Sequence, residues 1–324
     1  MMTPAEALST WVKQHKNYTQ ITPIPGDASS RHYFRVTEKD ATYIAVYAPP
    51  ASENNEAFVE VAKRFLKQGL NVPEVLQVNY REGFLLLSDL GDTQLLKVLN
   101  HTNVKDHYSK ALEDLIKLQG CRNFSTWQLP HFDSRLLSEE LSRFDEWYLD
   151  KHLAITLSES EHAMLKRVYD LLIEQAEGQP QVCVHRDYHS RNLMLLPNNE
   201  IGILDFQDAV LGPITYDLVS LLRDCYIKWP PEQVYEWVEE FWQVLHAKQM
   251  ISVSLSQFIT WFDWMGLQRH LKVLGIFARL YRRDNKTIYL CDMPLVLEYV
   301  LFVCDKYSEF TALKEFLLKR VKPT

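Results

Sequence analysis

One short stretch of the chain has residue types and a spacing that could carry out chemistry. Residues 185–192 read His-Arg-Asp-Tyr-His-Ser-Arg-Asn, and Asp205 follows further along, directly before a phenylalanine. This spacing matches the kinase catalytic-loop pattern H-R-D-x-x-x-x-N with its later metal-binding aspartate. In phosphoryl transfer the acceptor hydroxyl gives up a proton, which suits a carboxylate, and Mg²⁺ prefers oxygen ligands. We therefore predict that Asp187 is the catalytic base and that Asn192 and Asp205 bind Mg²⁺.

The alternative for each of these residues is a local role, because Asp, Asn and Ser are common in turns and caps. Strand-like apolar segments precede both acidic residues, QVCV at 181–184 and IGIL at 201–204. Between them, Pro-Asn-Asn-Glu at 197–200 predicts a hairpin turn. An acid, an amide and a second acid beside predicted strands favour a phosphoryl-transfer site over coincidence.

The N-terminal part of the chain predicts a small antiparallel sheet with accompanying helices. Thr3 followed by Pro4 is typical of a helix start. Residues 20–48 hold three segments rich in β-branched and aromatic residues, separated by turns, which predict an antiparallel meander. A helix capped by Ser52 and ending at Gly69 follows. Further strands are predicted at residues 74–79 and 82–88.

Helical patterns dominate the rest of the chain, apart from the strand-like residues 181–206. This change of pattern places a lobe boundary near residues 89–91. We predict an α+β, two-lobed fold, with a nucleotide-binding N-lobe at residues 1–89. The C-lobe, at residues 90–324, would carry the catalytic loop, the metal site and the substrate-binding helices.

Composition and charge exclude several classes of protein. The 324 residues are 47% hydrophobic and 24% charged, which is typical of globular proteins. A net charge of −7 argues against binding of nucleic acids through their phosphates. Five cysteines without a C-x-x-C pair predict neither disulfides nor zinc. The N-terminus shows no secretory pattern and no run of 18 apolar residues occurs, so we expect a cytoplasmic protein that binds no membrane and has no obligate protein partner.

With its catalytic-loop motif at residues 185–192 and the later Asp205, the chain resembles the aminoglycoside phosphotransferase family. This family has a two-lobed protein-kinase-like fold, with a small antiparallel-sheet N-lobe and a mainly helical C-lobe. The resemblance covers nearly the whole chain. It is most specific for the branch of the family that phosphorylates the anomeric C1 hydroxyl of amino sugars. This resemblance implies an ATP- and Mg²⁺-dependent kinase for N-acetylmuramate and N-acetylglucosamine in peptidoglycan recycling. Five blocks carry it, in the expected order: GDASSRHYFRV, FLLLSDLGD, VHRDYHSRNLM, ILDFQDAVLGPITYDLVSLLRDCY and WMGLQRHLKVLGIFARL.

The resemblance also implies roles for residues outside the catalytic loop. The backbone of Ser88, Asp89 and Leu90 would meet the adenine. Asp217 would brace the catalytic loop through backbone hydrogen bonds, and His185 would support the same loop. A turn of small residues would lie over the nucleotide phosphates: Gly26, Ala28, Ser29, Ser30 and Arg31.

The sequence departs from the kinase pattern at two places. The phosphate-binding turn has one glycine, although its other residues are small enough for backbone N–H groups to approach a phosphate. The third strand reads Ile-Ala-Val-Tyr at 44–47, where kinases have a lysine that binds the phosphates. Arg31 or Arg35 could supply this charge, and the alternative is that both are solvated. Glu56 and Glu60 lose their usual lysine partner, so we predict no catalytic role for either.

A basic segment bears on the choice of substrate. Residues 266–286 carry six basic residues and one acidic residue on a predicted helix. Such a helix would suit an anionic ligand, such as the lactyl carboxylate of N-acetylmuramate, and it disfavours polycationic aminoglycosides. The alternative is a solvated helix face, which is the commoner origin of a charge run.

The same helix carries candidate sugar-binding residues within an apolar stripe. Trp261, Trp264, Met265 and Gln268 recur at the spacing that buries one face of a helix, so core packing is the main expectation. Aromatic rings also pack on sugars, and we predict Trp264, Gln268 and Arg269 as sugar-binding candidates. For two histidines we expect hydrogen-bonded structural roles: His189 and His270.

Two other functions remain open from the sequence. One is a kinase of this fold that acts on another hydroxylated metabolite, such as choline or homoserine, because a fold alone does not define a substrate. The other is a nucleotide-binding pseudokinase, which the missing strand lysine suggests. The intact Asp187, Asn192 and Asp205 argue against the pseudokinase.

Overall fold

The computed structural model describes residues 3–25, 30–121 and 128–321. The chain forms two compact units. Unit 1 consists of Met1–Leu129 and Arg191–Ala209, and unit 2 of Pro130–Ser190 and Val210–Thr324. These units divide the chain at positions other than residues 89–91, because residues 90–129 and the hairpin after Arg191 belong to the same compact unit as the N-terminal sheet. The lobe division at residue 89 stays a prediction.

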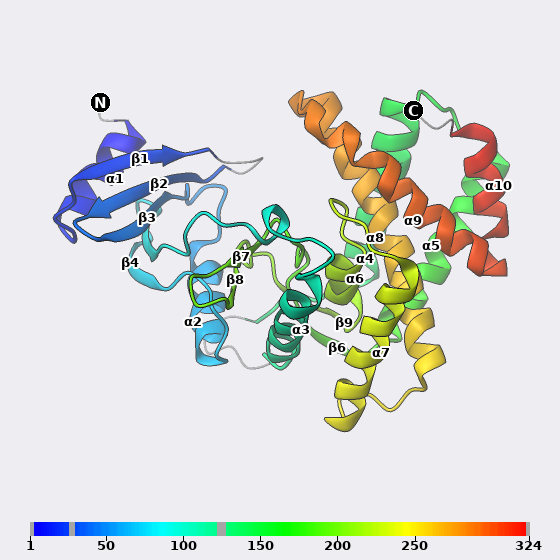
Figure 1. Ribbon diagram of the computed structural model, residues 1–324. Coiled ribbons are helices and arrows are strands. Elements are labelled where there is room, and N and C mark those ends of the chain that lie inside the picture. The colour runs from blue at the N-terminus through cyan, green and yellow to red at the C-terminus, as the bar shows by residue number, and fades with distance from the viewer. Residues whose placement is uncertain (1–2, 26–29, 122–127, 322–324) are drawn as a thin grey trace. The chain divides into compact units, whose positions relative to one another are not determined.

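Unit 1 contains a five-stranded antiparallel sheet with the strand order β1-β2-β3-β5-β4. Figure 1 labels β1, β2, β3 and β4 of this sheet. The predicted meander supplies three of these strands, and the two predicted later strands supply the others, so both predictions are confirmed. Phe34 pairs with Ala45, and Ala45 pairs with Leu86, which sets the register across the middle of the sheet. The strands are β1 (Gln20–Ile24), β2 (His32–Glu38), β3 (Ala41–Tyr47), β4 (Val75–Asn79) and β5 (Phe84–Ser88).

Two helices at the N-terminal end of unit 1 begin at side-chain caps. Helix α1 (Pro4–Lys13) begins after Thr3, as the sequence predicts, and the Thr3 hydroxyl and Glu6 form the reciprocal bonds of a capping box. It buries its apolar residues against the sheet. Helix α2 (Asn55–Lys67) begins two residues later than predicted, because Asn54 is the cap and accepts a hydrogen bond from the Ala57 N–H. The prediction of Ser52 as the cap is therefore wrong.

A short hairpin completes unit 1. Strand β7 (Leu193–Leu195) pairs antiparallel with β8 (Ile201–Ile203), so the turn predicted at residues 197–200 is confirmed. The Ile203 N–H donates to the Asn71 carbonyl at 2.8 Å, which joins the hairpin to the chain between α2 and β4. The remaining helices of unit 1 are η1 (Leu95–Lys97) and α3 (Val104–Gln119).

Unit 2 is mainly helical, and the long helix α8 (Leu255–Asp284) packs against most of its other helices (Figure 1). Two short strands, β6 (Gln181–Val184) and β9 (Val210–Pro213), pair antiparallel next to the catalytic-loop sequence. The other elements are α4 (Ser134–Arg143), the π-helix η2 (Phe144–His152), α5 (Glu159–Glu177), α6 (Tyr216–Leu222), α7 (Pro231–Ala247), η3 (Thr287–Cys291), α9 (Met293–Lys306), η4 (Ser308–Phe310) and α10 (Thr311–Arg320).

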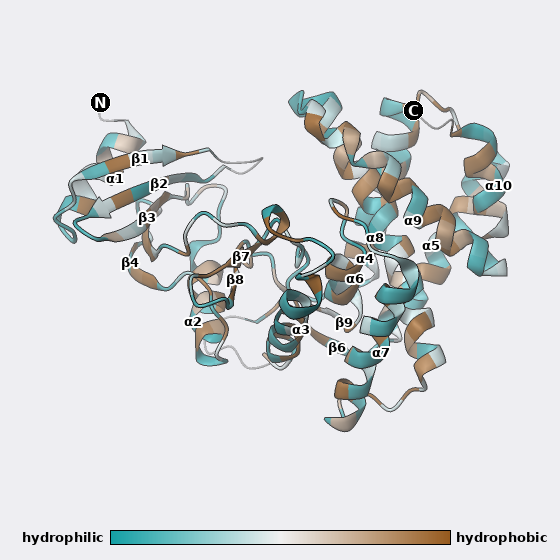
Figure 2. Cartoon of the chain, in the orientation of Figure 1, coloured by the Kyte–Doolittle hydropathy of each residue, from teal (hydrophilic) through white to brown (hydrophobic). Residues whose placement is uncertain are grey.

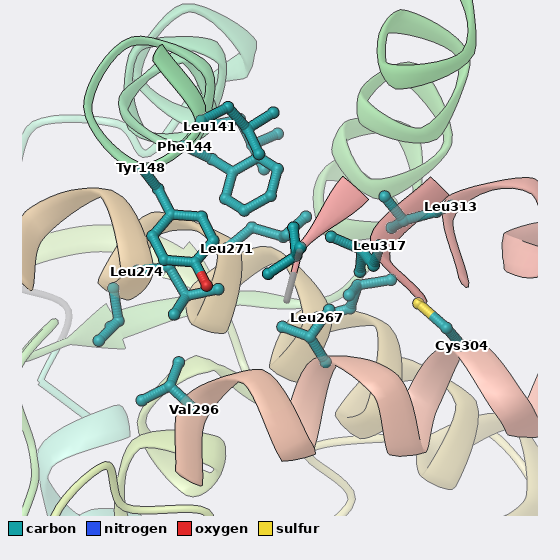
Figure 3. Close-up of a cluster of buried hydrophobic side chains, with 14 of the residues drawn as sticks. Leu141, Phe144, Tyr148, Leu267, Leu271, Leu274, Val296, Cys304, Leu313 and Leu317 are labelled. Atoms are coloured by element: carbon teal, nitrogen blue, oxygen red, sulfur yellow. The ribbon is translucent and has the colours of Figure 1, made fainter. Parts of the chain in front are cut away.

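The core of unit 2 forms around α8. Apolar and polar residues alternate along α9 and α10, as expected for helices that bury one face (Figure 2). Gly275 lets α8 approach the end of α4, because a Cβ there would lie 2.3 Å from the Arg143 carbonyl oxygen. Side chains from five helical segments meet in this core: Leu141, Phe144, Tyr148, Leu267, Leu271, Leu274, Val296, Leu313 and Leu317 (Figure 3).

One segment of unit 2 is long and apolar enough to cross a membrane by length and composition. It covers Thr287–Lys306, and 39% of its apolar window is buried. This segment contains no unbroken run of 18 apolar residues, because Asp292 and Glu298 interrupt the sequence. Val296, Val300 and Val303 of this segment pack in the core beside α8, which accounts for much of its apolar character.

The sheet in the N-terminal part and the mainly helical C-terminal part confirm the predicted α+β class.

Candidate active site

The catalytic-loop sequence begins directly after β6 and is held by a buried carboxylate of α6. Asp217 accepts hydrogen bonds from the backbone N–H groups of His185 and Arg186, at 2.6 and 3.0 Å. Burial raises the pKa of Asp217 to about 6, although His185 and the two backbone donors act in the opposite direction. The His185 ring accepts a third bond at Nδ1, from the Asp187 N–H at 3.2 Å. These contacts fix the first three residues of the loop, while the predicted role of Asp217 and His185, structural support of a catalytic loop, stays a prediction.

Two residues of the motif have backbone conformations that are unusual for non-glycine residues. Arg186 has φ 76° and Asp205 has φ 61°, both in the left-handed region. This conformation costs a side-chain-bearing residue roughly 1–2 kcal/mol, so the surroundings must hold it in place. At Arg186 the backbone bond to Asp217 and the side-chain contact described next provide this support.

A buried ionic network lies behind the loop. Glu140 of α4 is fully buried, and its carboxylate accepts from the Arg186 guanidinium at 2.5 Å and from Gln268 at 3.3 Å. The ammonium group of Lys272 lies 3.2 Å from the same carboxylate and donates to the Tyr216 hydroxyl at 2.8 Å. Burial alone would raise the pKa of Glu140, but Lys272 and Arg186 outweigh it and hold this pKa below its usual value. The network therefore joins α4, α6 and α8 to the loop.

Asp187 is partly exposed and ionised at neutral pH. Burial opposes its charge, but Lys272, His189 and Arg269 together hold its pKa well below the ordinary value. A carboxylate in this state can accept a hydrogen bond or a proton from a neighbouring hydroxyl group.

The two predicted metal ligands lie at one end of the hairpin in unit 1. Asn192 directly precedes β7 and Asp205 lies two residues beyond β8, and the pairing of Leu193 with Ile203 brings these two chain ends together. The Leu204 N–H also donates to the Asn192 carbonyl at 2.9 Å. Amide and carboxylate oxygens are ligands that Mg²⁺ prefers, so this donor pair fits the ion.

Asp205 and Phe206 are anchored within unit 1. Gln207 donates to the Asp205 carboxylate at 2.6 Å, and the Phe206 ring stacks on Phe58 of α2 with centroids 4.9 Å apart. The Arg31 guanidinium lies over the same Phe58 ring and pairs with Glu53 at 2.8 Å. An arginine–glutamate pair is thus present in the unit that lacks the strand lysine.

The other nucleotide residues predicted from the sequence are only partly described. The Ser88 N–H donates to the Glu74 carbonyl at 2.9 Å. Asp89 accepts from the Arg35 side chain at 2.7 Å, and Arg35 also contacts Asp92. Leu90 follows Asp89 in the chain, and Ser30 is exposed. The predictions for Gly26, Ala28 and Ser29 lie outside the described residues.

The sugar-binding candidates on α8 are buried. The Trp264 ring packs on Phe310 with centroids 4.8 Å apart, and Gln268 contacts Glu140. Arg269 is 2% exposed and donates to the Cys225 sulfur at 3.3 Å. The predicted apolar stripe, from Trp261 to Gln268, is confirmed by its burial. Sugar binding by Trp264, Gln268 and Arg269 stays a prediction.

The basic residues of α8 do not form one face. Arg269 and Lys272 point into unit 2, whereas Arg282 and Arg283 near the helix end are exposed. The sequence could not separate these groups, because the direction of each side chain depends on which helices pack around α8. His270 is buried and its Nε2 lies 3.0 Å from the Arg223 carbonyl, in agreement with the expected structural role.

Sequence reasoning missed three buried or half-buried acidic residues near the motif. Glu53 pairs with Arg31, Glu140 with Arg186, and Asp224 accepts two bonds from Ser190. Of the three, only Asp224 lies close in sequence to a predicted site residue, seven residues after Asp217. Glu140 lies 46 residues from Arg186, and no spacing rule connects them.

The fold and the loop define a protein of the kinase-like phosphotransferase class. Among solved structures, an ethanolamine kinase from Plasmodium vivax is similar, with a TM-score of 0.63 and 11% identity over 90% of this chain and 85% of that chain. This likeness shows the protein-kinase-like fold.

Sequence comparison gives the family. Residues 20–249 match the model of the phosphotransferase enzyme family, so the chain belongs to this family. It is 40% identical to an N-acetylmuramate/N-acetylglucosamine kinase from Pseudomonas aeruginosa, over 92% of this chain and 88% of that protein. It is 38% identical to a kinase of the same name from Neisseria meningitidis, over 93% of this chain and 90% of that protein.

Proposed function

We propose that this protein is an ATP-dependent kinase that phosphorylates the anomeric C1 hydroxyl of N-acetylmuramate and N-acetylglucosamine. The observation that carries the proposal is the 40% identity, over 92% of the chain, to a kinase named for these two sugars. The catalytic loop, held in place by buried carboxylates, agrees with it. The activity would belong to cytoplasmic recycling of peptidoglycan sugars.

Nucleotide and metal binding would fall to unit 1 and the residues of the predicted N-lobe, 1–89. Asn192 and Asp205 would hold Mg²⁺, which neutralises charge on the phosphates of ATP. The backbone of residues 88–90 would meet the adenine, and the turn at 26–31 would cover the phosphates. Arg31 would supply the positive charge that the strand lysine provides in protein kinases.

Proton transfer and sugar binding would fall to the predicted C-lobe, 90–324. The Asp187 carboxylate would accept the proton of the C1 hydroxyl while the hydroxyl oxygen bonds to the γ-phosphorus and the bond to ADP breaks. His185 and Asp217 would hold the loop in position for this step. Trp264, Gln268 and Arg269 are the candidates for sugar contacts, with Arg269 suited to a lactyl carboxylate.

Phosphorus NMR of the purified protein with Mg-ATP tests the proposal. Separate incubations would contain N-acetylmuramate, N-acetylglucosamine or their 1-O-methyl glycosides. We expect a glycosyl-1-phosphate signal from each free sugar and none from the methyl glycosides, because only the free sugars have a C1 hydroxyl. ATP binding without phosphorylation of either sugar would contradict the proposal and leave another metabolite or a pseudokinase as the explanation.

A further inference from the structure

Two buried carboxylates contact the catalytic loop at its opposite ends. Asp217 lies in α6 and holds the first loop residues, His185 and Arg186. Asp224 lies two residues beyond the end of α6 and holds Ser190, five residues further along the loop. Both carboxylates are fully buried. The family resemblance implies a role for Asp217, whereas nothing so far gives one to Asp224.

The Asp224 carboxylate is committed to this contact. Its Oδ2 accepts from the Ser190 N–H at 2.9 Å and from the Ser190 hydroxyl at 2.5 Å, and its Oδ1 accepts from the Tyr226 N–H at 3.0 Å. Ser190 is itself fully buried. Hydrogen bonds to an ionised carboxylate are stronger than neutral ones, and a buried carboxylate is costly unless such bonds satisfy it. Ser190 therefore has one well-defined position.

The residues next to Asp224 contact the same part of the unit. The Tyr226 ring packs edge-on against the ring of His189, with centroids 5.4 Å apart. The Cys225 sulfur accepts from Arg269, one of the cations that keep Asp187 ionised. The segment 224–226 thus contacts two consecutive loop residues and one cation that acts on Asp187.

Ser190 lies between the two proposed functional groups of the loop. Asp187 precedes it by three residues and Asn192 follows it by two. Two residues of extended chain span at most about 7 Å, so a fixed Ser190 restricts where the Asn192 backbone can lie. Ser190 is also the last residue of unit 2 before the chain enters unit 1.

We propose that Asp224 is a positioning residue that acts through Ser190 and sets the places of the Mg²⁺ ligand Asn192 and the base Asp187. The inference rests on the proposed kinase function. A role in stability alone would lower the amount of folded protein without changing the Mg²⁺ requirement of the folded fraction. A positioning role changes turnover and Mg²⁺ dependence together.

The test compares initial rates as a function of Mg²⁺ at saturating ATP and N-acetylglucosamine, with urea unfolding of each variant as a measure of stability. Asp224→Asn removes the charge, and Ser190→Ala removes the hydroxyl bond but keeps the backbone bond. Asp114→Asn is the matched control, because Asp114 is also buried but pairs with Lys117 of its own helix in unit 1.

We expect Asp224→Asn to lower kcat by roughly tenfold to a hundredfold, as small misplacements of reacting groups do. The half-saturating Mg²⁺ concentration should rise severalfold in the same variant. Ser190→Ala should move both quantities in the same direction by less, and Asp114→Asn should leave both unchanged.

Wild-type kcat and Mg²⁺ dependence in folded Asp224→Asn would overturn the inference. If Asp224→Asn does not fold, the same result for Ser190→Ala overturns it. A wild-type protein that phosphorylates neither sugar contradicts the proposed function instead. In that case Mg²⁺-dependent ATP binding, measured by calorimetry in the same variants, decides the inference: weaker binding in Asp224→Asn supports it, and unchanged binding overturns it.

Discussion

Helix α8 borders two buried ionic networks that share their chemistry and differ in what they connect. One is centred on Glu140 and the other on Asp263, and both carboxylates are fully buried. Glu140 lies within ion-pair distance of Arg186, Lys272 and, at 4.0 Å, Arg143. Asp263 pairs with Arg223 and Lys306, and both carboxylates also accept from neutral hydrogen-bond donors. Burying such a carboxylate costs several kcal/mol, which its partners must offset in both cases.

The Asp263 network connects helices to one another. Asp263 accepts from Arg223 at 2.5 Å and from Lys306 at 2.7 Å, and the hydroxyls of Tyr235 and Tyr307 complete its shell. Its partners come from α7, from the end of α6 and from the end of α9. In the part of the chain that the structure describes, none of these partners belongs to the catalytic loop.

The Glu140 network includes a catalytic-loop residue. Its partner Arg186 has left-handed backbone geometry and directly precedes Asp187. Its second cation, Lys272, also helps to keep Asp187 ionised. The comparison teaches that a buried ion pair gives no indication of function by itself, and that only a network attached to the loop can change the chemistry.

The largest expected effect is that of removing Asp187, the carboxylate that Lys272 of the Glu140 network helps to keep ionised. Asp187→Ala should lower turnover by roughly 10²–10⁴, the usual contribution of acid–base catalysis, and leave ATP binding largely intact. Steady-state rates and calorimetric titration with Mg-ATP would measure these effects. Wild-type-like turnover would remove Asp187 from the base role.

The second prediction separates the two networks directly. Glu140→Gln and Asp263→Asn should each lower the free energy of unfolding by about 3–5 kcal/mol, because each leaves buried cations without a charged partner. Only Glu140→Gln should also lower the kcat of the folded protein, by roughly tenfold or more, because only it releases Arg186. Urea denaturation and steady-state kinetics on the same preparations would measure both quantities. Equal losses of kcat in the two variants would remove the distinction between the networks.

The smallest expected effect is a pH dependence near the Asp263 network. Burial first, and then Arg269, lowers the pKa of His270 to about 3, against about 6.5 in an unfolded chain. The folded protein therefore keeps His270 neutral, and its contribution to stability is complete above pH 6.5 and is lost as the pH falls toward 3. The free energy of unfolding should fall over this range by a few kcal/mol more in the wild type than in His270→Gln. Parallel pH profiles of the two proteins would contradict this assignment.

The sequence predicts the sheet of unit 1 and the hairpin that carries Asn192 and Asp205, because both depend on local patterns. Alternating β-rich segments and turn residues act over a few positions, and the strand pairing of Leu193 with Ile203 follows from the turn between them. The sequence predicts Ser52 as the cap of α2, whereas the structure has Asn54 there. Both are polar residues that commonly cap helices, so local patterns do not distinguish them.

Local residue patterns are enough to predict the α+β class, the phosphotransferase motif and the spacing of Asp187, Asn192 and Asp205. Which charged residues support that motif depends on how the helices of unit 2 pack. Glu140, Lys272 and Asp224 are distant from the loop in sequence, and burial brings their charges next to it. The direction of a charged side chain on α8 depends on the helices packed around it, and a linear pattern of residue types does not contain that information.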